Sequence, residues 1–192
     1  MLAGGIAMLQ ASALFAGASL DRGFLRLPVM EQAKSVLLQP LRVTKVSDQE
    51  TVVAATFAVR RQQLFEAMTR PEHLMQWMGA AGMTLQDAHV DPHAGGSFRF
   101  VFQRQSGREI EVRGAYRTFD PPGGFSYLES YDFSPLQIEV TTQLEDAGDE
   151  TRFTQTLRYG STRERDEDFE PVATSSREAY ARLGRYLTQR AP

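Results

Sequence analysis

The most constraining feature of this sequence is a change of hydrophobic period near residue 160. Between Thr84 and Tyr159, apolar and polar side chains alternate in short runs separated by turn residues, which is typical of antiparallel strands. After Ser161 the apolar residues recur at intervals of three and four, which predicts one long helix that buries a single stripe. The stripe consists of Phe169, Val172, Ser176, Tyr180, Leu183 and Leu187. The pattern therefore predicts a meander of strands followed by a C-terminal helix.

The chain before this meander adds one strand and two short helices to the prediction. Residues 51–59 alternate in the same way, with Val53 and Phe57 on one face. Residues 61–78 carry apolar side chains at helical spacing, and Pro71 divides them into two helices. We therefore predict an α+β fold, in which a curved antiparallel sheet of about six to seven strands wraps around the long C-terminal helix, with short helices after the first strand.

Two features mark the start of the predicted C-terminal helix. Ser161 and Glu164 have the spacing of a capping box, in which each side chain bonds a free backbone N–H of the first turn. Pro171 follows within the same apolar pattern. Because proline lacks an N–H and its ring crowds the preceding turn, we expect it to kink the helix or to delay its start.

Residues 1–48 are predicted to form an N-terminal extension and linker, followed by a single domain at residues 49–190. The first 20 residues are apolar, yet they include Gln10, and no basic residue precedes Arg22. A transmembrane span needs about 20 continuous apolar residues, and a secretory signal begins with positive charge. Neither fits, so we expect no stable membrane insertion, and Met30 is an alternative translation start.

Composition limits the function classes. Hydrophobic residues make up 42% of the chain, which is enough for one well-buried core. The net charge of -3 and the isoelectric point near 5.7 argue against the broad basic surface that nucleic-acid binding needs. The chain has no cysteine, which fits a reducing compartment. We expect a cytoplasmic protein that does not bind nucleic acid.

The glycine pair Gly95 and Gly96 has two interpretations, a phosphate-binding loop or a tight corner between strands. A phosphate loop places its glycines between a strand and the N-terminus of a helix. Here the glycines precede the alternating aromatic run of residues 97–104. We therefore predict a structural corner in which glycine permits a positive φ angle.

Four potential metal ligands, Asp87, His89, Asp91 and His93, recur at every second position. An extended strand would place all four on one face. Adjacent side chains on that face stand nearly 7 Å apart, too far for four ligands to converge on one ion. We predict a solvated face, with neither a metal site nor a cofactor.

The predicted architecture leaves a space between sheet and helix. Because one helix cannot cover every apolar side chain of a curved sheet, the space either fills with aromatic rings or stays open as a ligand cavity. Inward-facing aromatic rings, with Phe125 among them, and adaptable methionines favour a hydrophobic cavity. The candidate cavity residues are Phe65, Trp77, Met78, Met83, Phe98, Phe100, Phe102, Tyr116, Tyr127, Phe153, Ser176 and Tyr180. No catalytic residue is predicted, because the inward polar groups have no spacing that specifies a reaction.

Several motifs resemble one known family, in the same order and with nearly the same spacing, from about residue 52 to residue 187. The run LFEAMTRPEHLMQWMGAAGM resembles the signature helix of the bacterial homologues of the activator of Hsp90 ATPase, within the START-like SRPBCC superfamily. The corner DPHAGG, the Gly-Ala-Tyr strand with its Pro-Pro turn, and the strand ETRFTQTLRY resemble further family motifs. The resemblance implies a helix-grip fold for residues 49–190.

The same resemblance implies a function by analogy. It favours a small domain that binds an apolar small molecule or lipid in an internal cavity. Two alternatives remain open: an enzyme similar to polyketide cyclases and aromatases, and an interaction module similar to the chaperone-activating domain. The candidate partners are therefore an apolar ligand, a second copy of the chain, and a chaperone.

Three positions depart from the family pattern. The usual Trp-Trp pair is Trp77-Met78, the usual arginine of the glycine corner is His93, and a common Gly-Met pair of the last helix is Pro171-Val172. Since these positions are expected near the cavity or its entrance, a ligand of a relative is not transferable to this chain.

Overall fold

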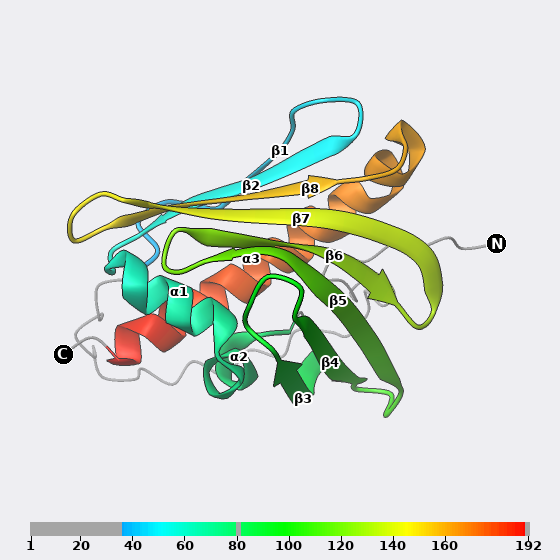
Figure 1. Cartoon of the computed structure of the whole chain (residues 1–192), viewed down its shortest axis with the longest axis horizontal. Coiled ribbons are helices and arrows are strands. Elements are labelled where there is room, and N and C mark those ends of the chain that lie inside the picture. The colour runs from blue at the N-terminus through cyan, green and yellow to red at the C-terminus, as the bar shows by residue number, and fades with distance from the viewer. Residues whose placement is uncertain (1–35, 80–81, 191–192) are drawn as a thin grey trace, which may run out of the picture.

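Eight antiparallel strands form one curved sheet that encloses a long helix in the computed structural model, which describes residues 36–79 and 82–190 (Figure 1). The strand order is β1-β2-β8-β7-β6-β5-β4-β3. The strands are β1 (Arg42–Lys45), β2 (Glu50–Phe57), β3 (Met83–Val90), β4 (Ser97–Arg104), β5 (Glu109–Asp120), β6 (Gly124–Tyr131), β7 (Ser134–Asp146) and β8 (Thr151–Arg158). The helices are α1 (Arg61–Thr69), α2 (Pro71–Trp77) and α3 (Thr162–Arg190). The predicted α+β arrangement is confirmed.

Strand β1 lies where the sequence predicts a linker, and it raises the strand number above the predicted six to seven. It pairs with β2, with Val43 opposite Val53. Just before it, Val36 and Leu41 are buried in the core, and the N–H of Ala58 donates to the carbonyl of Val36 at 2.8 Å. Residues 36–45 are therefore part of the fold. The sequence pattern does not predict this strand, because β1 is short and mostly exposed. Its pairing with β2 uses backbone groups, which leave no hydrophobic pattern.

The remainder of the predicted extension, including Met30, lies outside the described residues. Within residues 36–79 and 82–190, no helix is both long and apolar enough to cross a membrane.

Helix α3 begins at its predicted cap and continues through its proline. The Oγ of Ser161 accepts a hydrogen bond from the N–H of Glu164 at 3.3 Å, which is one half of the predicted capping box. The helix starts at Thr162 and contains Pro171 in its interior, so the prediction of a delayed start is wrong. Residues on both sides of the proline are buried against the sheet, and this packing outweighs the local loss of one backbone hydrogen bond.

Aromatic rings join the sheet to α3. The predicted run on β4 faces inward: Phe98, Phe100 and Phe102 are each at most 2% exposed. The rings of Phe98 and Phe100 stack with centroids 4.9 Å apart. On the other side, Tyr180 of α3 lies 4.8 Å from Phe153 of β8. These rings form the walls of the space between sheet and helix.

The glycine pair forms the predicted corner between β3 and β4. Gly95 has a φ angle of 87°, which glycine adopts without strain. The N–H of Gly95 donates to the carbonyl of Tyr116 at 2.9 Å, and the N–H of Tyr116 donates to the carbonyl of Gly96 at 2.8 Å. A Cβ atom at Gly96 would collide with the carbonyl oxygen of Asp91. The corner therefore fixes the register of β4 against β5.

Replacing each of the two glycines by alanine destabilises the corner for a different reason, so we expect different losses of stability. Gly95→Ala meets open space and only the cost of a positive φ angle, about 1 kcal/mol. Gly96→Ala forces the backbone of the corner apart, which costs about 3 kcal/mol. Urea unfolding of both variants against the parent chain measures the two losses. Equal losses would contradict the close approach at Gly96.

Candidate functional site

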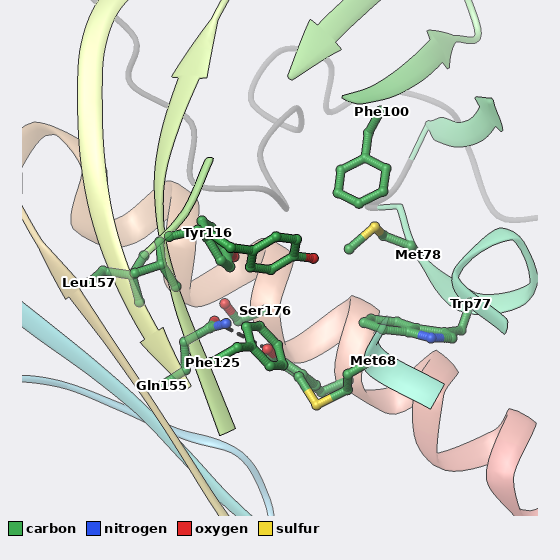
Figure 2. A pocket seen from close by; sticks show the side chains of 12 residues that line it. Met68, Trp77, Met78, Phe100, Tyr116, Phe125, Gln155, Leu157 and Ser176 are labelled. Carbon is green, nitrogen blue, oxygen red and sulfur yellow. Dashed lines mark hydrogen bonds between the residues drawn. The ribbon is translucent and has the colours of Figure 1, made fainter. Parts of the chain in front are cut away.

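A cavity of about 30 Å³ lies between α3, the inner face of the sheet and the helices α1 and α2 (Figure 2). Because one water needs roughly 10–15 Å³ of such space, the cavity has room for about two water molecules. Its lining residues are Met68, Trp77, Met78, Phe100, Tyr116, Phe125, Tyr127, Val140, Gln155, Leu157, Ser176 and Tyr180. Most of the predicted space is therefore filled by the protein's own side chains.

The structure brings one part of the predicted site together around this cavity. The predicted residues that line it are Trp77, Met78, Phe100, Tyr116, Phe125, Tyr127, Ser176 and Tyr180. They come from α2, the residue after it, three strands and α3. In Figure 2, Trp77, Met78 and Phe100 lie on one side of the cavity, and Tyr116 and Ser176 lie on the other.

The other predicted residues are buried in the core but do not line the cavity. Phe65 packs against Phe125, with ring centroids 6.0 Å apart. Phe98 and Phe102 flank Phe100 along β4. These side chains, together with Phe153 and Met83, support the lining residues from behind.

Four lining residues are absent from the prediction: Met68, Val140, Gln155 and Leu157. A signal for two of them exists in the sequence, because Gln155 and Leu157 share the period-2 face of Phe153 in β8. Because Gln155 is polar, the alternation of apolar residues alone does not predict its inward position. Nothing in the sequence shows that Met68 of α1 reaches the same cavity as Trp77 of α2.

The wall at α2 is rigid at one residue and soft at two others. The Nε1 of Trp77 donates to the carbonyl of Ala67 at 2.9 Å, and the indole stacks on the ring of Tyr180 at 6.0 Å. Met68 and Met78 lie beside it with flexible thioether chains (Figure 2). Methionine changes rotamer at little cost, so these two side chains are the adjustable part of the wall.

A short chain of hydrogen bonds crosses the otherwise apolar lining. The hydroxyl of Tyr180 donates to Oε1 of Gln155 at 3.1 Å, and Nε2 of Gln155 donates to Oγ1 of Thr142 at 3.2 Å. All three side chains are buried. The bonds fix the amide of Gln155 at the edge of the cavity.

The tyrosine hydroxyls of the lining remain protonated at neutral pH. Burial raises the pKa of Tyr116 above its ordinary value of 10.0. Burial and the nearby Glu129 raise the pKa of Tyr127 as well, and burial is also the main cause of the raised pKa of Tyr180. The cavity therefore presents neutral phenols, which serve as hydrogen-bond donors and not as bases.

Beyond the cavity, toward the N-terminal half of α3, two buried acids bond to tyrosines. The hydroxyl of Tyr159 donates to Oδ2 of Asp168 at 2.7 Å, and the hydroxyl of Tyr131 donates to Glu129. Both carboxyl groups are fully buried. Such hydrogen bonds offset part of the cost of burying a carboxyl group.

A second hollow of about 620 Å³ opens on the surface between α1, α2 and the C-terminal end of α3. Nδ1 of His73 lies 2.5 Å from the hydroxyl of Tyr186, and Arg190 donates to the same hydroxyl oxygen at 3.1 Å. The remaining rim mixes acidic and basic side chains, including Glu66 and Arg60. This groove is much larger than the cavity, and it is open to solvent.

The structure contains the predicted solvated face between Asp87 and His93. Asp87 pairs with Arg99 at 2.9 Å, and Asp91 pairs with His93 at 3.1 Å. Among the residues that the structure describes, no group of three or more histidine or acidic side chains is placed to hold a metal ion.

We expect the protein to lose stability in mild acid because of His73. Burial and the charge of Arg190 lower the pKa of His73 from 6.5, with Arg70 acting in the same direction and Glu72 and Glu66 opposing it. The unfolded chain therefore takes up a proton first, and the free energy of unfolding falls as the pH drops below about 6.5.

In the variant His73→Asn this fall should become smaller, whereas His89→Asn, at an exposed histidine, should keep it. Urea unfolding on both sides of pH 6.5 provides the measurement. An unchanged pH dependence in His73→Asn would show that another group causes the loss.

Comparison with known proteins places this geometry in a family. Residues 58–188 match the family model described as Activator of Hsp90 ATPase homolog 1-like protein. No curated protein matches the chain. A structure from Rhodobacter sphaeroides is 27% identical, with a TM-score of 0.75, and covers 79% of this chain and 99% of its own.

Two further structures show the same fold at lower identity. A protein from Nitrosomonas europaea is 17% identical with a TM-score of 0.69, covering 76% of this chain and 98% of its own. The AHSA1-like protein from Aeromonas hydrophila is 15% identical with a TM-score of 0.59, covering 72% and 93%. The predicted START-like helix-grip fold is thereby confirmed. Since the family model covers most of the chain, this protein belongs to the family of activator of Hsp90 ATPase homolog 1-like proteins.

Proposed function

We propose that this protein binds an apolar small molecule in the cavity between α3 and the sheet. The observation that carries the proposal is the lining itself: it combines aromatic and aliphatic walls with a few fixed polar groups, which is the composition of small-molecule sites in general. The helix-grip fold places this lining at the centre of the molecule, where a ligand would be shielded from water.

The size of the cavity defines how binding must occur. Sites for small molecules usually enclose about 300–1,000 Å³, far more than the 30 Å³ present here. A ligand therefore has to displace side chains. Met68 and Met78 are the apolar side chains of the lining with the most rotatable bonds, and Trp77 is held by its hydrogen bond to Ala67. We expect the two methionines to move while the indole remains in place.

An enzymatic role has less support. The titratable side chains among the lining residues are the tyrosines Tyr116, Tyr127 and Tyr180, and their raised pKa values make them poor general bases at neutral pH. Cyclase-like chemistry would have to use them as donors to a substrate oxygen. Contact with a chaperone and pairing with a second copy stay predictions, since a single chain is described.

The proposal predicts that filling the cavity abolishes binding. Ser176→Leu places a larger apolar side chain at a lining position of α3, while Arg177→Leu introduces the same residue at the neighbouring exposed position. A neutral hydrocarbon, isopropylnaphthalene, should bind the parent chain and Arg177→Leu but not Ser176→Leu. At a ligand concentration of 100 times Kd, the stabilisation is about 2.7 kcal/mol, which raises the Tm by roughly 5–10 °C.

Calorimetric titration separates binding from any change that Ser176→Leu makes to stability alone. If isopropylnaphthalene binds Ser176→Leu as tightly as the parent chain, the ligand does not occupy this cavity. If it binds none of the three proteins, the proposed function is wrong for apolar molecules of this size.

A further inference from the structure

Two hydroxyl groups of the cavity lining have no hydrogen-bond partner among the residues that the structure describes. They belong to Tyr116 of β5 and Ser176 of α3, whose side chains are 5% and 1% exposed. The hydroxyl of Tyr180 in the same lining is different, because it donates to Gln155. Tyr116 and Ser176 thus stand out as polar groups that the protein itself leaves unsatisfied.

Such groups are costly unless something pairs with them. Leaving a buried donor unsatisfied costs about 1–3 kcal/mol, and buried polar groups in native proteins are nearly always hydrogen-bonded. Both hydroxyls border the cavity (Figure 2). A molecule inside the cavity is therefore positioned to supply the missing acceptor, and the chemistry of that molecule can be derived from the charges around it.

The surroundings disfavour a negatively charged ligand. The lining residues include no lysine, arginine or histidine within the described part of the chain. An anion without a cationic partner in such a site pays a large desolvation cost.

We propose that the cavity selects a neutral, mainly aromatic molecule that carries a carbonyl oxygen, with Tyr116 and Ser176 as the hydrogen-bond donors. This inference rests on the proposed function, because it names the class of ligand for the same cavity. A carbonyl oxygen has two lone pairs and can accept from either hydroxyl or from both. The rings of Trp77, Phe100 and Phe125 supply flat apolar walls for the rest of the molecule.

The test compares three ligands of nearly the same shape on the full chain by calorimetric titration. Acetylnaphthalene carries the carbonyl, isopropylnaphthalene replaces it by a hydrocarbon group, and naphthoate replaces it by a carboxylate. Since one hydrogen bond changes binding by about three- to tenfold, acetylnaphthalene should bind at least threefold more tightly than isopropylnaphthalene. Naphthoate should bind more weakly than both.

Two conservative variants locate the donors. Tyr116→Phe and Ser176→Ala each remove one hydroxyl and leave the shape of the cavity almost unchanged. Each should reduce the preference for the ketone over the hydrocarbon by about threefold or more, while the affinity for isopropylnaphthalene stays the same or rises. Tyr186→Phe, which removes a tyrosine hydroxyl in the surface groove, should leave the preference unchanged.

The outcomes separate this inference from the function on which it rests. Equal binding of ketone and hydrocarbon by the parent chain overturns the inference and leaves apolar binding intact. A ketone preference that survives in both Tyr116→Phe and Ser176→Ala also overturns it, as does naphthoate binding as tightly as the ketone. Failure of all three ligands to bind overturns the proposed function itself.

Discussion

The packing of a single helix, α3, against the concave face of the sheet is the interaction on which the rest of this structure depends. One helix has one apolar stripe, whereas the inner face presents side chains from strands throughout the sheet. Large aromatic rings fill the remaining space between helix and sheet. Tyr180 of α3 packs against Phe153, and Phe98 and Phe100 extend from β4. Where these rings fail to meet, the small cavity remains. The candidate site is thus a direct consequence of how the core is filled.

Polar groups inside this core divide into those that the protein satisfies and those that it leaves open. Tyr159 bonds Asp168, and Tyr180 bonds Gln155. Each of these pairs offsets the cost of its own burial and helps to specify one arrangement of helix and sheet. The hydroxyl of Tyr116 has no such partner among the described residues and borders the cavity. Because this hydroxyl borders the cavity, a molecule bound there can supply its missing partner.

Much of the site follows from periodicity, and the remainder follows from packing. The inward positions of Phe100, Tyr116 and Tyr127 could be predicted because strands alternate with a period of two and one face must be buried. The same alternation places Gln155 on the inward face, but a polar side chain is not expected to be buried. The position of Met68 could not be predicted from the sequence, because it depends on the angle at which α1 meets α2. That angle is set by contacts between residues distant in sequence.

The sequence by itself determined the fold class, the helix cap at Ser161 and the glycine corner at Gly95 and Gly96, because each depends on local periodicity or on the φ angle of one residue. The tertiary structure decided three other features: that residues 42–45 form an edge strand, that α3 passes through Pro171, and that the core closes to about 30 Å³. These depend on backbone pairing and on the fit of side chains from separate elements. Neither leaves a periodic trace along the chain.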